Sequence, residues 1–182
     1  MKRHLIMIGM IAGLVLPSTV AMAQVKGSVG VTGTVVTGCA LGTIAGSDVW
    51  DLGVLVDTTT GLLRNDLTAA PKTVTGSSCG VRSVITVNAT PMTAQSFAGQ
   101  PGAGLSDIVN YTATASGWTT IPASYTTGAG TNANASQIQP APFAGDVEVS
   151  ISDFATGGGD ALRLVADPLY QGVVTVTLTV AN

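Results

Sequence analysis

An alternating segment near the start of the chain limits what this protein can fold into. Residues 24–39 read QVKGSVGVTGTVVTGC, with valine or glycine at every odd position from 25 to 35 and Lys, Ser, Gly or Thr at every even one. Side chains alternate faces along a strand, so this pattern predicts a strand with one apolar face and one polar face. Glycine on the apolar face weakens an isolated strand but lets its backbone approach a shallow site closely. Such a strand needs a groove to fill, either in its own domain or in another.

The residues before this segment have the pattern of a secretory signal peptide. Lys2, Arg3 and His4 precede an apolar run over residues 5–16, and Ala21 and Ala23 form a small-x-small cleavage site. The run is too short for a retained membrane anchor, which is the alternative interpretation. We therefore expect residues 1–23 to be removed, leaving 159 residues that are exported, not inserted in a membrane, and sufficient for one domain.

Charge and composition narrow the function classes. Without Lys2 and Arg3, five basic residues face ten acidic ones, which argues against nucleic acid or an anionic membrane surface as a partner. Charged residues are scarce, whereas Thr, Ser, Ala, Val and Gly are abundant, as is typical of β-sheets with uncharged polar faces. No long stretch combines helical periodicity with helix-forming residues.

Short strands separated by turn signals are expected throughout the rest of the chain. The clearest is 172–181, in which Val174, Val176, Leu178 and Val180 alternate with threonines. Glycine and proline mark loops over 91–107, 126–136 and 157–159. The other expected strands cover 35–41, 49–56 with a bulge or bend at its glycine, 72–79, 81–90, 108–113, 118–121, 146–152 and 161–166. Many short strands and no helices predict an all-β, immunoglobulin-like β-sandwich.

The two cysteines, Cys39 and Cys79, are expected to form one disulfide because the chain is expected to be exported. A reactive thiol pair or a metal site is the alternative. It lacks support, because the sequence has no CxxC and its one histidine, His4, lies in the signal peptide.

Both ends of the mature chain are alternating strands, and two arrangements are open. Both strands can pair inside one domain. Alternatively, the first strand leaves its domain and completes the sheet of a neighbour by β-strand addition. An unpaired apolar edge is an aggregation hazard, so each arrangement must cover it.

The ordered pattern resembles the chaperone–usher pilus subunits, including type 1-like fimbrial subunits and the Csu and spore-coat U group. It consists of Gly27-x-Val29-x-Val31-x-Gly33-x-Val35-Val36, then Cys39-Ala40, Asp51-Leu52-Gly53, Cys79, Tyr170 and the alternating C-terminal strand. Residues 91–160 carry no matching motif. The next-to-last residue is Ala181, where many members of the family have an aromatic residue.

The resemblance implies a sandwich that lacks its last strand, with residues 24–35 as an N-terminal donor-strand extension and 36–182 as the pilin-like domain. The implied partners are identical or related subunits joined head to tail, a periplasmic chaperone and an outer-membrane usher. The implied location is a fimbria at the cell surface, reached through the periplasm, that serves adhesion or biofilm formation. The implied donor residues are Val25, Gly27, Val29, Val31 and Gly33, and the implied acceptor groove and chaperone contacts are Val174, Val176, Leu178, Val180 and Asn182.

No catalytic residue, metal ligand or cofactor site is expected. Without a histidine after cleavage, Ser-His-Asp and Cys-His arrangements are excluded. Asp48, Asp51 and Asp57 are interpreted as turn residues and strand ends. Asp146, Glu148 and Asp153 are interpreted as a solvated strand face, with a weak calcium site as the alternative. Trp50 and Trp118 are interpreted as core residues, although they could line a sugar site in a carbohydrate-binding or tip-adhesin domain. A third possibility is a coat-like surface protein whose first strand closes its own sheet.

Overall fold

The computed structural model of the protein describes residues 25–35 and 38–182, and the predicted signal peptide lies outside these ranges. Within them, every regular element is a β-strand. The ranges contain no helix long and apolar enough to cross a membrane. The expected all-β fold is therefore confirmed.

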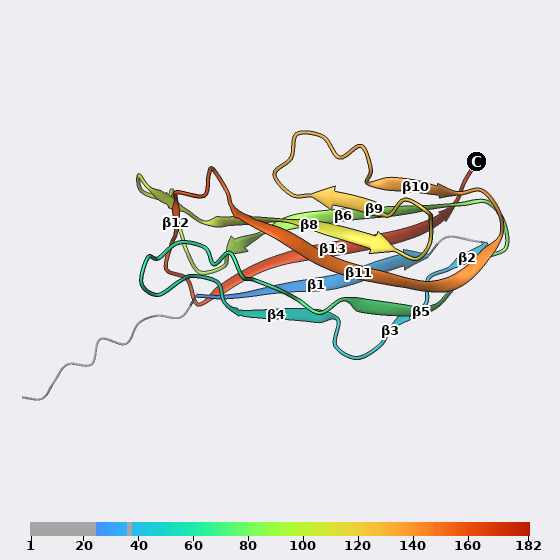
Figure 1. Ribbon diagram of the computed structural model, residues 1–182, viewed down its shortest axis with the longest axis horizontal. Helices are drawn as coiled ribbons and strands as arrows, with labels where there is room; N and C mark the ends of the chain where they lie inside the picture. The colour runs from blue at the N-terminus through green and yellow to red at the C-terminus, as the bar shows by residue number, and fades with distance from the viewer. Residues whose placement is uncertain (1–24, 36–37) are drawn as a thin grey trace, which may run out of the picture.

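The strands form one large sheet that curls over so that its two halves face each other (Figure 1). The order along the sheet is β2-β5-β11-β8-β6-β13-β1-β4. One half contains β4 (Val49–Val54), β1 (Lys26–Val35), β13 (Leu169–Val180), β6 (Ser83–Ala94) and β10 (Ser136–Gln139). The other contains β5 (Lys72–Cys79), β11 (Phe143–Thr156), β8 (Ile108–Ser116) and β9 (Ala123–Thr126), with β2 (Cys39–Ala40) and β3 (Thr43–Ile44) against β5. Two short strands, β7 (Leu105–Ser106) and β12 (Arg163–Leu164), pair separately.

The halves are joined where β6 and β8 pair, at Met92 with Val109 and Thr93 with Ile108. Beyond that point the two strands take different partners: β10 pairs with β6, and β9 pairs with β8. The core fills the space between the halves, which gives the immunoglobulin-like sandwich type expected from the sequence.

Period-2 patterning explains most of the strands. In β8, alternate residues from Val109 to Ala115 are buried, and their neighbours are half-buried. In β13, Val174, Val176 and Leu178 are at most 1% exposed. The glycine expected to mark a bulge or bend in 49–56 is Gly53, which has a φ of 63° beside a register shift between β4 and β1. These segments were predictable because one face of each is uniformly apolar or small.

Other expected boundaries were wrong. Residues 118–121 are not a strand, because Trp118 turns into the core and is 1% exposed. The short strands β9 and β10 follow this segment instead. Of the strand expected over residues 161–166, only Arg163–Leu164 is a strand. Strand β6 continues through Pro91 to Ala94, a region expected to be loop. Pro91 is tolerated because the β6–β13 register shifts there, and proline at a bulge removes no regular ladder bond.

A buried carboxylate, Asp167, fixes the loops at one end of the sandwich. Asp167 is 2% exposed. Its carboxylate oxygens accept hydrogen bonds from the main-chain N–H groups of Ser96 at 2.7 Å and Leu169 at 2.9 Å. Burial alone would raise the pKa of this carboxyl, but these main-chain hydrogen bonds outweigh it, and the pKa of Asp167 lies below its usual value. The ionised form is therefore the one that stabilises the fold.

We expect the contribution of Asp167 to stability to disappear in acid. Because the folded pKa is lowered, the contribution is present above the unfolded pKa of about 3.9 and is lost as the pH falls through the folded value. Asp167→Asn should lower stability at pH 7 by about 1–3 kcal/mol, because an amide offers one acceptor oxygen instead of two. Urea unfolding of both proteins from pH 7 to 2 measures this difference. A difference in the free energy of unfolding between the two proteins that is the same at every pH would contradict this prediction.

Candidate functional site

The candidate functional site is the slot that β1 occupies between β13 and β4. Strand β1 runs parallel to β13 over ten residue pairs, from Lys26 beside Leu169 to Val35 beside Leu178. On its other side it runs antiparallel to β4. The groove expected along the C-terminal strand is therefore filled by the chain's own N-terminal strand. This is the first of the two arrangements that the sequence left open.

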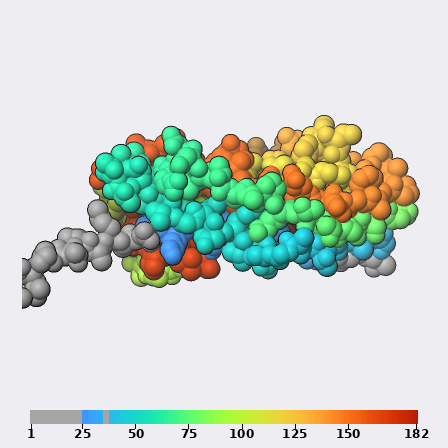
Figure 2. Space-filling model, turned by 60° about the horizontal axis from the view of Figure 1, so that its bottom comes forward, coloured from blue at the N-terminus to red at the C-terminus, as the bar shows by residue number. Residues whose placement is uncertain are grey.

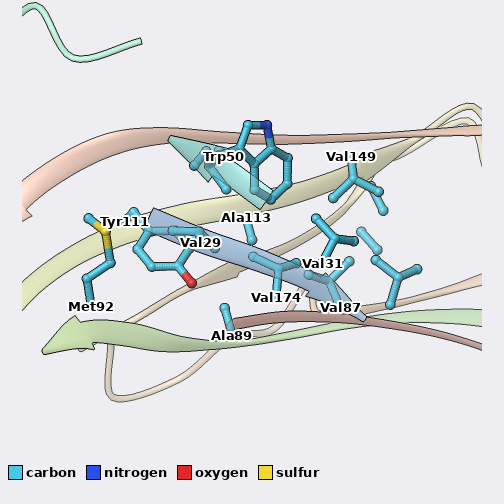
Figure 3. Close-up of a cluster of buried hydrophobic side chains, with 14 of the residues drawn as sticks. Val29, Val31, Trp50, Val87, Ala89, Met92, Tyr111, Ala113, Val149 and Val174 are labelled. Carbon is cyan, nitrogen blue, oxygen red and sulfur yellow. The ribbon is translucent and has the colours of Figure 1, made fainter. Parts of the chain in front are cut away.

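The expected donor residues face the core in the alternating pattern. Val25, Val29 and Val31 are at most 5% exposed, and Gly27 is buried. Gly33 is exposed, so the buried face of β1 ends at Val31. Figure 3 shows Val29 and Val31 among core side chains that include Trp50, Tyr111 and Val174. On the outer face in Figure 2, the blue residues of β1 show only as a small area beside teal and red neighbours.

The expected acceptor residues lie on β13 next to this strand. Val174, Val176 and Leu178 are buried, and Val180 is partly buried. Asn182 is exposed, and its main-chain oxygen accepts a hydrogen bond of 3.3 Å from Nη1 of Arg82. The apolar acceptor residues are therefore together, whereas Asn182 lies outside the groove.

Two glycines of β1 allow close approach to neighbouring leucines. A Cβ atom on Gly27 would lie 2.7 Å from Cδ2 and 2.9 Å from Cδ1 of Leu55. A Cβ atom on Gly33 would overlap Cδ2 of Leu41. A pocket of about 150 Å³ lies at Gly33, lined mainly by apolar residues that include Val31, Leu41 and Val176. Leu55 and Leu41 therefore leave no room for a Cβ atom at these two glycines, although a pocket remains beside Gly33.

We expect Gly27→Val to destabilise the inserted strand by about 1–3 kcal/mol, because overpacking against Leu55 forces side chains or backbone to shift. Gly30→Val is the matched control, since it introduces the same residue where a Cβ atom would meet nothing within 4 Å. Urea unfolding compares the two variants. Equal midpoints would show that the fit at Gly27 is not tight.

The connection to β2 determines the direction of β1. Only three residues separate Val35 from Cys39, where β2 begins, so four residue steps span at most about 14 Å. Strand β1 itself is about 33 Å long at about 3.3 Å per residue. A reversed strand would place Val35 at the far end of the slot, beyond the reach of that connection. In its own groove β1 can therefore only run parallel to β13.

The disulfide lies just after this connection. Cys39 and Cys79 are bonded, with an S–S distance of 2.06 Å, and they join β2 to β5 at directly paired positions. The pairing predicted from the sequence is confirmed. Because the bond anchors Cys39, only residues before it can leave the fold without breaking the second half of the sandwich.

The remaining sequence candidates have structural roles. The indole N–H of Trp50 donates to the Ala70 carbonyl at 2.7 Å, and that of Trp118 donates to Oγ of Ser83 at 3.1 Å. Both tryptophans are core residues, as interpreted. Asp51 accepts from the Gly53 N–H, and Asp57 accepts from those of Thr59 and Thr60, as turn residues do.

The acidic strand face expected at residues 146–153 is exposed. Asp146, Glu148 and Asp153 all reach solvent, and Asp146 accepts a hydrogen bond from the Gly76 N–H at 3.0 Å. Among residues 25–35 and 38–182, no three His, Cys, Asp or Glu side chains gather as metal ligands.

The fold and slot define a class: an all-β, immunoglobulin-like sandwich closed by its own N-terminal strand. No protein-family model matches the sequence, and no curated protein matches it.

Proposed function

We propose that this protein is a structural subunit of a surface fimbria that polymerises by donor-strand exchange and serves adhesion or biofilm formation. The observation that carries the proposal is the position of β1. It is a strand near the N-terminus that pairs with β13 over ten residues and buries Val25, Val29 and Val31 in the core. A short connection and a disulfide separate it from the rest of the fold. The same strand from a second molecule presents the same side chains to the same slot.

The parallel direction of β1 favours exchange. A strand from another molecule is free of the connection to Cys39, so it can run antiparallel to β13. Antiparallel pairing is somewhat more stable per residue than parallel pairing. This reversal makes the longer ladder, which has ten residue pairs with β13, antiparallel and therefore more stable. It makes the shorter ladder with β4 parallel. Alternate residues share one face of a strand in either direction, so the buried valines can face the core whether β1 runs parallel or antiparallel to β13.

Exchange of this kind produces a fibre. Each molecule gives its strand to one neighbour and receives a strand from another, so the contact is head to tail and does not close. In the cell, we propose that a periplasmic chaperone covers the slot until an outer-membrane usher delivers the next subunit. These partners follow from the resemblance described above.

The experiment uses a variant that lacks residues 24–35 and a synthetic peptide of those residues. The variant should be exported but should not form fibres, and it should bind the peptide in a complex that resists dilution. The matched control is the same peptide with Val29→Asp, which should not bind because it would bury an unpaired charge. Fibres formed by the shortened variant would refute the proposal.

The second candidate is the self-closed, coat-like surface protein, and the intramolecular β1–β13 pairing favours it. A refolding experiment on the full-length chain distinguishes this candidate from the fimbrial subunit. After unfolding and refolding at high concentration, a subunit that exchanges strands should give polymers, whereas a self-closed protein should return only to monomer. Size-exclusion chromatography and electron microscopy separate the two outcomes.

A further inference from the structure

Residues 25–35, which include β1, read VKGSVGVTGTV, nearly the same in both directions about Gly30. We propose that this symmetry lets the strand of a second molecule fill the slot in reverse, with Gly30 at the same place. This placement rests on the proposed strand exchange and assigns its register. Lys26 and Thr34 differ, but both are exposed. The other residues equally far from Gly30 match: Val29 with Val31, Ser28 with Thr32, Gly27 with Gly33, and Val25 with Val35.

The inward face of the strand is the same after reversal. Turning the strand end for end about an axis through Gly30, perpendicular to the sheet, keeps the odd-numbered residues toward the core, because faces alternate with period two. An incoming Val31 then takes the place of Val29, and an incoming Val29 takes the place of Val31. Both places are at most 5% exposed, so each receives the same side chain that it holds in the self-closed protein.

The two outer glycines fit the neighbouring leucines in either direction. In the self-closed protein Gly27 lies against Leu55 and Gly33 lies against Leu41, and a Cβ atom at either glycine would force its leucine to move. A reversed strand brings Gly33 to Leu55 and Gly27 to Leu41. A larger side chain at either position would therefore strain both arrangements, and glycine at both positions permits both.

The main-chain hydrogen bonds are also compatible with reversal. In the self-closed protein the odd residues of β1 direct their main-chain groups toward the β4 side, where the Val31 N–H donates to the Asp48 carbonyl at 2.8 Å. Reversal turns this edge of the strand toward β13. An incoming Val31 then lies opposite Gly172, and an incoming Val29 lies opposite Val174. Opposite residues of antiparallel strands exchange paired hydrogen bonds, so the reversed strand can form a regular ladder.

Engineered disulfides on the full-length chain can report this register. In the self-closed monomer Ser28 lies opposite Gln171, and Thr175 lies four residues further along β13. Four residues of a strand span about 13 Å, whereas a disulfide requires Cα atoms within about 7 Å. In the reversed register an incoming Ser28 takes the place of Thr32, opposite Thr175. The Oγ1 atoms of Thr32 and Thr175 are 3.0 Å apart in the monomer, so side chains at these two places can meet.

The test variant carries Ser28→Cys and Thr175→Cys, and the matched control carries Ser28→Cys and Gln171→Cys. Each is unfolded in urea without reductant, refolded at high concentration, separated into monomer and polymer, and only then oxidised. The test variant should remain free of new bonds as a monomer and should form covalent ladders between molecules as a polymer. The control should close within each monomer and should not join molecules in the polymer. Non-reducing gel electrophoresis measures both results.

The outcomes separate the reversed register from strand exchange itself. Polymers of the control that become joined between molecules would show that the exchanged strand runs parallel to β13. Polymers that neither cysteine pair joins would show that the strand lies in another register. Either result overturns the reversed, Gly30-centred placement and leaves strand exchange in place. A chain that returns only to monomer overturns the proposed function and the reversed placement together.

Discussion

Replacing Val29 with aspartate should lower the free energy of unfolding by at least about 4 kcal/mol. The change removes about 1.5–3 kcal/mol of apolar burial and places an unpaired carboxylate among core side chains, which costs several kcal/mol more. Single domains are stable by only about 5–15 kcal/mol, so this loss should detach β1 or unfold the whole protein. Urea unfolding followed by circular dichroism measures the loss.

Thr32→Asp is the control for this prediction, because it lies on the same strand but on the exposed face. Its side chain forms only partly buried or exposed hydrogen bonds with β13, the shortest of them 3.0 Å to Oγ1 of Thr175, so its effect should stay below about 1 kcal/mol. Limited proteolysis of the Val29→Asp variant separates the two mechanisms of loss. Cleavage confined to residues before Cys39 indicates a detached β1, whereas cleavage throughout indicates global unfolding. Equal stability of the two aspartate variants would contradict the burial of Val29.

Removing the disulfide should be the second large perturbation. The bond closes a loop with a sequence separation of 40 residues, and the loop-entropy relation gives about 4 kcal/mol for this length. The Cys39→Ala and Cys79→Ala double variant should therefore unfold at a much lower urea concentration than the oxidised protein.

The reduced wild-type protein is the control for the double variant. Reduction breaks the same bond without truncating two buried side chains, so the midpoint of the reduced protein should also fall, but by somewhat less than that of the double variant. The double variant should also release β1 more readily, because Cys39 anchors the connection that follows it. A free energy of unfolding within about 0.5 kcal/mol of that of the oxidised protein would show that the bond contributes little.

Much of the fold was predictable because it depends on local alternation. The segments around Val29 and Val176 alternate apolar and polar residues, and a strand with one buried face requires this pattern. The disulfide was predictable because an exported chain with two cysteines has a single possible intramolecular pair. The predicted strand over residues 118–121 is wrong, because only Trp118 of its apolar residues is buried and Ile121 is exposed.

The candidate sites depended more on tertiary structure. The sequence predicted which residues of β1 face a groove, but local alternation is the same whether that groove belongs to the same molecule or to another. Trp50 and Trp118, the residues that could line a sugar site, pack inside the core.

The all-β class, the inward faces of the main strands and the cysteine pair follow from the amino-acid sequence alone, because they depend on period-2 burial and on the number of cysteines. The parallel placement of β1 beside β13 does not follow from it, because it depends on contacts between distant residues. The short connection to a disulfide-anchored strand limits the direction of β1.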